Sequence, residues 1–533
     1  MGRSPRRDLV AGVTVAVVAL PLALAFGISS GLGAGAGLVT AILAGGLAAF
    51  FGGSNLQVSG PTGAMTVVLV PIVAQYGTTA VLTVGLLAGV LLLGLALARA
   101  GRVMRYIPLP VVEGFTLGIA VIIALQQVPA ALGVPGEGEK VLLAAVDAVV
   151  TWVQQPQWLP VAVAAGVAAV MLVGARLRPG LPLSLAAVVV ASVAVGVSGA
   201  AVAVIGPVPS TLPAPQLPPL SPALVSALVV PAVAVAALAA LESLLSATVA
   251  DAMSVAERHD SDRELFGQGI ANLASPLFGG IPATAAIART AVNVRAGARS
   301  RLAAITHSAV LLLIVLVGSR WVAEIPLAAL AGVLIATAVQ MVEVSSLRAL
   351  LRSTRGDALV LVVTAVATVL LDLVTAVILG LVVAGFAALR QVARTARVDE
   401  TPLDEDHGDE ESRLLADRIV AYRLDGPLFF GAAHTFLLEL SEVGDVRVVV
   451  LRMSRILSLD ATGASVLADT ITRLEGRGVT VLMSGVRPGH DRVLRQLGVY
   501  DSLAHEGHLF ATTPEAIAHA RVHASGAAHP RPG

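Results

Sequence analysis

Two stretches of this sequence place polar residues, glycine and proline at the start of an apolar segment, where a regular helix is hard to continue. They are residues 54–64 (SNLQVSGPTGA) and 278–286 (FGGIPATAA). Proline is favoured in the first turn of a helix, so each stretch predicts an extended piece followed by a short helix. The first N–H groups of a helix have no intrahelical acceptor and together carry about half a positive charge. Two such helix ends facing each other would bind an anion without a buried lysine.

Two charged residues stand out, one just after the second stretch and the other in the middle of a different apolar segment. Arg289 lies one or two turns into the second short helix, where it would add a full positive charge. Glu242 lies near the middle of the apolar segment 222–250, and Ser246 follows one turn later on the same helix face. An ionised carboxylate inside a bilayer is costly, so such a residue is paired, protonated or functional. We expect Glu242 to carry a proton beside Ser246; the alternatives are a purely structural glutamate and two kinked segments that bind nothing.

The composition places these residues in a lipid bilayer. Of the 533 residues, 56% are hydrophobic and 13% are charged, and the formal net charge is zero. A soluble globular protein has about 25% charged residues. Apolar segments near the ~20 residues that cross a hydrocarbon core recur along the chain, and they predict a polytopic α-helical membrane protein with fourteen transmembrane segments. These segments are 9–28, 36–52, 62–76, 79–98, 108–132, 158–175, 181–199, 222–250, 265–278, 284–296, 302–319, 326–344, 357–371 and 374–390.

The arginines predict the orientation of these segments. If the N-terminus is cytoplasmic and every segment spans, basic residues concentrate in the inside loops, as the positive-inside rule requires. The outside loops then carry only Lys140 and Arg320. Both termini are therefore expected in the cytoplasm. The inside loops carry Arg99, Arg102, Arg105, Arg176, Arg178, Arg258, Arg263, Arg295, Arg299, Arg301, Arg348, Arg352 and Arg355.

A proline-rich connector divides the membrane part, residues 1–397, into two sets of seven segments. The connector covers residues 206–222, and residues 134–157 resemble an external loop with an interfacial helix. The two interrupted stretches begin the third segment of each set, in repeats of about 1–200 and 222–392. Corresponding Gly/Pro-interrupted spans in two halves are typical of inverted-repeat transporters with a site at the midplane.

Beyond residue 397 the sequence has the character of a soluble domain. An acidic linker, 398–416, precedes an α/β domain over 417–525, and residues 526–533 are expected to be disordered. Strand-like runs at 418–424, 446–453 and 479–485 alternate with helix-like runs at 433–443, 462–476 and 490–497.

Several functional classes are disfavoured by what the sequence contains. The chain has no cysteine, which excludes disulfides, thiolate catalysis and Cys-based metal sites. The membrane part holds only two histidines, His259 and His307, and no evident nucleophile or metal cluster. The neutral charge gives no sign of nucleic-acid binding. We therefore expect no enzymatic activity, no cofactor and no metal.

The motifs in this sequence resemble those of the SulP sulfate-permease group of anion transporters, which includes prestin. The resemblance covers nearly the whole chain and rests on 21–26 (PLALAF), 60–64 (GPTGA), 242–251 (ESLLSATVAD), 264–272 (ELFGQGIAN) and 280–290 (GIPATAAIART). It implies seven plus seven inverted repeats, a core domain that moves against a gate domain, and a bacterial inner-membrane homodimer.

The resemblance also implies where the anion binds: between the N-termini of the third and tenth helices, beside an aromatic residue of the first. In sodium-coupled bicarbonate members, oxygen-bearing residues occupy the positions that are Glu242, Ser246 and Ile287 here, so the loss of a ligand at Ile287 favours H⁺ over Na⁺ as the coupling ion. The candidate substrate-binding residues are Phe26, Gly60, Pro61, Thr62, Gly63, Ala64, Thr284, Ala285, Ala286 and Arg289.

The C-terminal domain resembles a STAS domain, named for its similarity to anti-sigma-factor antagonists. The motif is Asp460-Ala461-Thr462-Gly463, at a strand-to-helix turn. Antagonists carry a phosphorylatable serine directly after the aspartate, where this chain has Ala461, so a phosphorylation switch is not expected. Thr462 is a candidate helix cap. The domain would serve dimerisation or regulation through a cytosolic protein partner, or would only support folding and trafficking.

Three functional hypotheses follow from these residues. The first is a secondary active transporter of sulfate, bicarbonate or a dicarboxylate, coupled to protons. The second is a membrane sensor that detects an anion and signals through its STAS domain, which the missing phosphorylatable serine disfavours. The third is a nucleobase–proton symporter of the same inverted-repeat plan, which Arg289 and the STAS domain disfavour.

Overall fold

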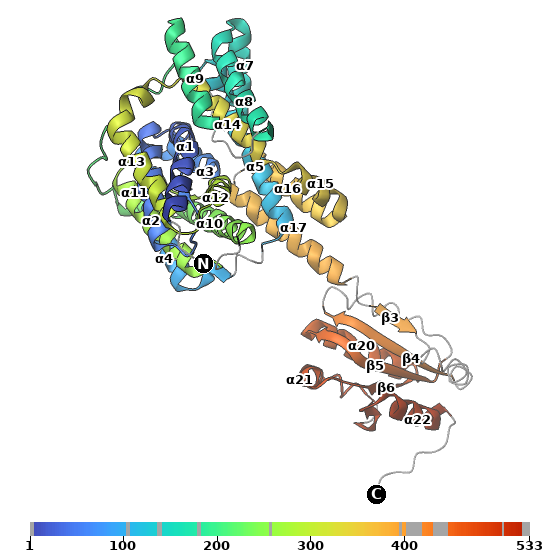
Figure 1. Ribbon diagram of the computed structural model, residues 1–533. Coiled ribbons are helices and arrows are strands. Elements are labelled where there is room, and N and C mark those ends of the chain that lie inside the picture. Colours follow the sequence, from blue (N-terminus) through green and yellow to red (C-terminus); the bar gives the residue numbers. More distant parts are fainter. Residues whose placement is uncertain are drawn as a thin grey trace. The chain divides into compact units, whose positions relative to one another are not determined.

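A computed structural model describes residues 5–102, 107–135, 141–177, 183–254, 258–371, 373–393, 397–400, 418–429, 446–503 and 506–524. The chain divides into two compact units, Met1–Val382 and Val383–Gly533. Figure 1 shows the first as a bundle of helices and the second as a sheet with helices packed on it.

The first unit is helical over most of each apolar segment that the sequence predicts, although residues 284–285 of the segment 284–296 form a short strand. Two helices lie outside those segments: α7, the predicted interfacial helix, and α15, a strongly amphipathic helix that the sequence analysis did not predict. The described helices are α1 (Pro5–Ser29), α2 (Ala34–Phe51), α3 (Gly63–Tyr76), α4 (Thr78–Leu97), α5 (Leu109–Gln126), α6 (Val128–Leu132), α7 (Val141–Gln154), α8 (Trp158–Leu177), α9 (Leu183–Ser198), α10 (Pro222–Met253), α11 (Ser261–Leu277), α12 (Ile287–Arg295), α13 (Leu302–Ala323), α14 (Leu327–Met341), α15 (Val344–Ser353), α16 (Arg355–Leu370) and α17 (Leu373–Ala393), which continues past Val382 into the second unit.

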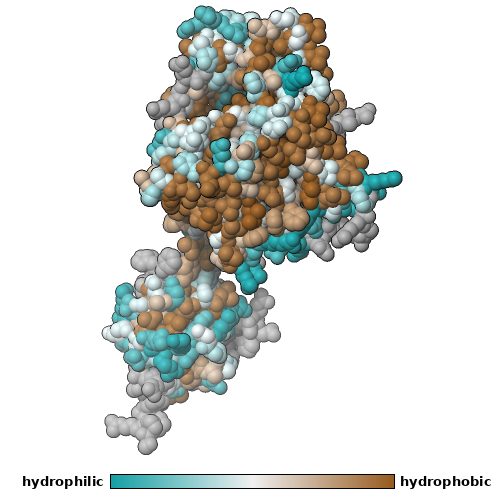
Figure 2. All heavy atoms as spheres, turned by 90° about the vertical axis from the view of Figure 1, so that its left-hand side faces the viewer, coloured by the Kyte–Doolittle hydropathy of each residue, from teal (hydrophilic) through white to brown (hydrophobic). Residues whose placement is uncertain are grey.

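The length and surface of these helices fit a bilayer. Within the described residues, nine helices are long and apolar enough to cross a membrane on their own. Figure 2 shows hydrophobic residues covering much of the visible face of the helical unit. Large apolar side chains of the unit such as Val90, Val190 and Leu313 are exposed, as expected of a surface that meets lipid. The count of fourteen crossings stays a prediction.

The packing of the first unit is reciprocal between its two halves. If α1–α5 correspond to α10–α14 in order, α1 packs on α13 and its counterpart α10 packs on α4. In the same way α2–α13 mirrors α11–α4, and α1–α12 mirrors α10–α3. This is the contact pattern of an internal two-fold repeat, as predicted from the position of the two interrupted segments.

The helices of this unit form two groups, which Figure 1 shows side by side. One group contains α1–α4 and α10–α13, and the other contains α5–α9 and α14–α16. We call them the core group and the gate group. Both interrupted segments belong to the core group. Small residues let its helices approach closely: a Cβ on Gly37 of α2 would stand 1.9 Å from the carbonyl oxygen of Ala23 in α1.

The second unit contains a five-stranded sheet in the order β3-β4-β5-β6-β7. Strand β3 is antiparallel to β4, and the remaining neighbours are parallel. After the end of α17, the helices of the unit within the described residues are α20, α21 and α22, and a short 3₁₀ helix, η2, precedes β7. The bounds are β3 (Arg397–Glu400), β4 (Ile419–Leu428), β5 (Val448–Leu459), α20 (Ala461–Gly476), β6 (Thr480–Ser484), α21 (Pro488–Gln496), η2 (Glu506–His508), β7 (Leu509–Phe510) and α22 (Thr513–Ala524).

Two expectations for this domain were wrong. Residues 397–400 form strand β3, so the acidic linker does not begin at 398 as a structureless segment. The cap of α20 is Asp460, whose carboxylate accepts the Gly463 N–H at 2.7 Å, and not Thr462. Aspartate is among the strongest N-cap residues. The remaining linker 401–416, the predicted helix 433–443, the tail 526–533, Arg105, Lys140 and Arg178 lie outside the described residues.

We predict that Gly37→Ala destabilises the protein by about 1–3 kcal/mol, because its methyl group cannot fit between α2 and the α1 backbone. Gly94→Ala in α4 is the matched control, since a Cβ there meets no atom within 4 Å. Thermal unfolding of the purified protein in detergent measures both. Equal melting temperatures for the two variants would contradict the close approach of α1 and α2.

Candidate functional site

Two short strands bring the interrupted stretches together. Strand β1 (Ser59–Gly60) pairs with β2 (Thr284–Ala285) in antiparallel register, with Ser59 opposite Ala285 and Gly60 opposite Thr284. Helix α3 begins three residues after Gly60, and α12 begins two residues after Ala285. The pair therefore brings the N-termini of two short helices close together, as the sequence predicted for an anion site.

Helix α10 supports this strand pair through hydroxyl groups. Ser243 Oγ is 3.0 Å from Thr284 Oγ1 and accepts the Ala285 N–H at 3.2 Å, and Thr284 Oγ1 donates to the carbonyl of Ala239. Ser246 Oγ is 2.9 Å from Thr290 Oγ1, which also accepts the Val58 N–H at 3.1 Å. Ser246, predicted beside the coupling ion, thus ties α10 to α12.

Buried amide side chains bond to the interrupted stretches, two of them through backbone groups and one through the Ser59 hydroxyl. Asn272 donates to the Ala283 carbonyl and accepts the Ala283 N–H, both at 2.8 Å. Asn293 donates to the Leu56 carbonyl at 2.7 Å, and Gln268 donates to Ser59 Oγ at 2.7 Å. A buried backbone group without a partner is costly away from water, so these side chains permit extended chain inside the helical unit.

Thr62 connects the start of α3 to Glu242. Its side chain caps α3 by accepting the Met65 N–H at 3.3 Å, and its hydroxyl donates to Glu242 Oε2 at 2.9 Å. Glu242 is partly buried, and Thr62 is 6% exposed. The predicted proton carrier and the predicted anion site are therefore joined by one hydrogen bond.

Arg289 approaches the same strand pair through Pro61. The side chain is 2% exposed, and Nη2 donates to the Pro61 carbonyl at 2.8 Å. Nη1 is buried and has no acceptor among the described residues. A Cβ on Gly60 would stand 2.5 Å from Nη1, so the absence of a side chain at residue 60 leaves room for the guanidinium.

Phe26 belongs to α1, and its side chain lies against the start of α3, as predicted. The residue is 6% exposed, and a Cβ built on Gly63 would stand 3.1 Å from its Cε1. Thr66 of α3 donates a long hydrogen bond of 3.5 Å to the Phe26 carbonyl. The aromatic ring of α1 therefore packs against the first turn of α3.

The backbone amides of the site do not all remain available for a ligand. The Ala285 N–H donates to Ser243, and the Ala286 N–H donates to the Val58 carbonyl at 3.1 Å. The first N–H groups inside a helix have no intrahelical acceptor. In α3 these belong to Gly63 and Ala64, and in α12 they begin at Ile287, one residue after the predicted Ala286.

Sequence reasoning missed the residues that support the site: Ser243, Gln268, Asn272, Thr290 and Asn293. Each is an isolated polar residue, and only the fold shows which backbone group it meets. It also missed a histidine cluster in the second unit, formed by His508, His519 and His523. The spacing of His519 and His523, four residues apart in a helix, was a readable signal for two of the three.

Two family models match this chain: residues 6–364 match the Sulfate permease family, and residues 415–516 match the STAS domain. The Bacillus subtilis protein named "Putative sulfate transporter YvdB" is 34% identical over 95% of this chain and 96% of the relative. "Bicarbonate transporter BicA" of Picosynechococcus sp. is 31% identical over 93% of this chain and 92% of the relative. The solved transmembrane domain of a cyanobacterium bicarbonate transporter BicA aligns with a TM-score of 0.65 at 32% identity, covering 70% of this chain and 97% of that one.

The fold and the comparisons together define a multi-pass helical membrane transporter with an α/β domain at its C-terminal end. The chain belongs to the sulfate permease family of anion transporters and carries a STAS domain.

We predict that Gly60→Ala weakens anion binding at least about tenfold, a loss of roughly 1.4 kcal/mol. The new methyl group would displace the Arg289 guanidinium and its hydrogen bond to Pro61. Gly46→Ala in α2 is the control, since a Cβ there makes an ordinary 3.5 Å contact with Ser308. Titration with sulfate and with bicarbonate measures both variants, and unchanged affinity in Gly60→Ala would contradict this geometry.

Proposed function

We propose that this protein is a secondary active transporter that binds a small anion, of the sulfate, bicarbonate or dicarboxylate class, between the N-termini of α3 and α12. The observation that carries the proposal is the β1–β2 pair, which joins the two helix starts beside a buried arginine. The family membership and the names of the relatives support the substrate class.

The electrostatics of the site favour a negative solute. Each helix N-terminus contributes about half a positive charge, and Arg289 contributes a full one with Nη1 still available. Amide and guanidinium donors both match oxyanions. Because backbone N–H groups can donate to any small oxyanion, this geometry supports the class of substrate without choosing among its members.

The hydrogen bond between Thr62 and Glu242 supports coupling to protons. Glu242 accepts a hydrogen bond from Thr62, the residue directly before α3. Protonation of Glu242 would remove a negative charge close to the α3 amides, so proton binding and anion binding favour each other. A sodium site at the same place is less well supported. The side chain of Ile287 offers no oxygen, and the Ser246 hydroxyl already bonds to Thr290.

The two helix groups support an alternating-access movement. Both helix starts and α10 belong to the core group, so that group can carry the complete site past the gate group. We further propose that both termini face the cytoplasm of a bacterial inner membrane, that two copies associate, and that the STAS domain has a dimerisation or regulatory role.

The proposal is tested with the purified full-length protein in proteoliposomes. Uptake of radiolabelled sulfate, bicarbonate and fumarate is measured with an imposed pH gradient, with an imposed sodium gradient and with neither, and uracil serves as a neutral control. We expect uptake of at least one anion that the pH gradient accelerates. Anion binding without flux would support a sensor instead, and uptake of uracil alone would support a nucleobase carrier.

We predict that Arg289→Gln weakens binding of sulfate more than binding of bicarbonate. A Coulomb interaction scales with the charge of the ligand, so the loss for the divalent anion should exceed about tenfold. Arg295→Gln, at the exposed end of the same helix, is the control. An equal loss for both anions in Arg289→Gln would indicate that the arginine only supports the fold.

We predict that Glu242→Gln abolishes the response of uptake to a pH gradient. Glutamine can still accept the Thr62 hydrogen bond, so the site should keep its structure and bind the anion. Glu343→Gln replaces an exposed carboxylate and is the control. If uptake by Glu242→Gln still follows the pH gradient, Glu242 does not carry the coupled proton.

A further inference from the structure

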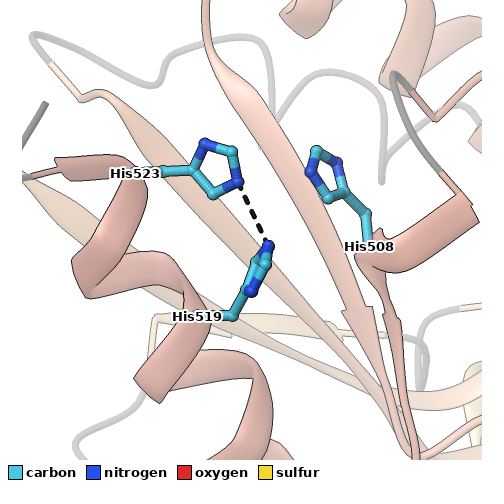
Figure 3. A group of neighbouring side chains, drawn as sticks. All are labelled: His508, His519 and His523. Atoms are coloured by element: carbon cyan, nitrogen blue, oxygen red, sulfur yellow. Dashed lines mark hydrogen bonds between the residues drawn. The ribbon is translucent and has the colours of Figure 1, made fainter. Parts of the chain in front are cut away.

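Three imidazole rings meet at one end of the sheet in the second unit. His519 and His523 lie one turn apart on α22, and His508 ends the short helix η2 just before β7. Figure 3 shows the ring of His508 directed toward the two rings of α22. The ring centroid of His508 lies 5.8 Å from the ring centroid of His519 and 5.1 Å from the ring centroid of His523.

The distances between the ring nitrogens suit a shared metal ion. One nitrogen from each histidine can be chosen so that all three lie within 4.8 Å of one another. Nε2 of His519 and Nε2 of His523 are 3.2 Å apart. In a tetrahedral zinc site with bonds of about 2.0–2.1 Å, two nitrogen ligands are separated by about 3.3 Å, so this pair already has the required spacing.

The surrounding structure holds both sides of the cluster. Ala516, Ile517 and Ala520 of α22 are buried in an apolar cluster against β4, β5 and β6. Strand β7 pairs with β6 immediately after His508, with Leu509 opposite Met483. The helix and the turn are thus both fixed on the same sheet, which holds the three rings within reach of one another.

We propose that His508, His519 and His523 form a binding site for a divalent transition metal ion, with Zn²⁺ as its typical occupant. Imidazole nitrogen is a preferred ligand of zinc, whereas magnesium and calcium prefer oxygen. His508 is 2% exposed, while His519 and His523 are partly exposed, so an ion can enter and keep a water molecule as its fourth ligand. The proposal revises the sequence-based expectation of no metal site, for the second unit only.

Metal binding at this position would connect the last described helix to the turn before β7. An ion bound only by the folded form stabilises it by mass action. Occupancy would therefore protect α22 and β7 against local opening. This inference does not depend on the transported anion, because all three histidines belong to the second unit.

The experiment uses the full-length protein, purified without a polyhistidine tag and stripped with a chelator. Zn²⁺ is titrated by calorimetry with elemental analysis, and Co²⁺ is added to record its visible spectrum. We expect one Zn²⁺ per chain with an affinity that falls at least about tenfold in His519→Ala and in His523→Ala, and an intense tetrahedral Co²⁺ spectrum that both variants lose. His490→Gln, in the same unit, is the control.

Hydrogen exchange gives an independent readout. Zn²⁺ should slow amide exchange in α22 and β7 of the wild-type protein and of His490→Gln, and should have no effect on either histidine variant. The variants themselves should fold, since alanine is the best helix former. Equal Zn²⁺ binding by the wild type and by both variants, or no binding by any of them, would overturn the proposal and leave a packed histidine cluster.

Discussion

The arrangement of the membrane unit depends on four residues of extended backbone, paired as β1 and β2 inside a bundle of helices. Extended chain inside such a bundle is tolerated only where each exposed amide and carbonyl finds a partner. The strand pair supplies some of these partners, and Asn272, Asn293, Ser243 and Thr290 supply others. Because these groups are satisfied, two helices can start next to each other in the interior of the unit.

This constraint also explains how the two repeats cooperate. The pair contains one strand from each repeat, and Arg289 of the second repeat holds the Pro61 carbonyl of the first. Helix α10 then bonds to both: Glu242 meets Thr62, and Ser243 and Ser246 meet β2 and α12. Neither half contains a complete site. The reciprocal packing of α1–α4 and α10–α13 places both halves of the site in the same group of helices.

Much of this arrangement could be predicted from the sequence, since glycine and proline at matching places in two apolar series are a local signal with a direct structural meaning. The positions of Phe26, Thr62, Glu242 and Arg289 around the helix starts agree with that reading. The supporting hydrogen bonds could not be predicted, because an isolated asparagine or threonine in an apolar segment does not reveal which distant carbonyl it will meet.

The cap of α20 was misassigned for a simpler reason: Asp460 and Thr462 are both good caps, and only the backbone shows where the helix starts. Helix α15 was missed because its short amphipathic pattern does not resemble a membrane span.

Much of the donor set at the start of α3 and α12 belongs to the main chain, and this affects how such a site changes during evolution. Almost any residue replacement keeps a backbone N–H; only proline removes it. Mutational drift can therefore alter the walls of the site, at Phe26 or Thr62 for example, while the donors of Gly63, Ala64 and Ile287 persist. In the anion site that we propose, one oxyanion could accordingly be exchanged for another through a few wall residues, without rebuilding the positive end of either helix.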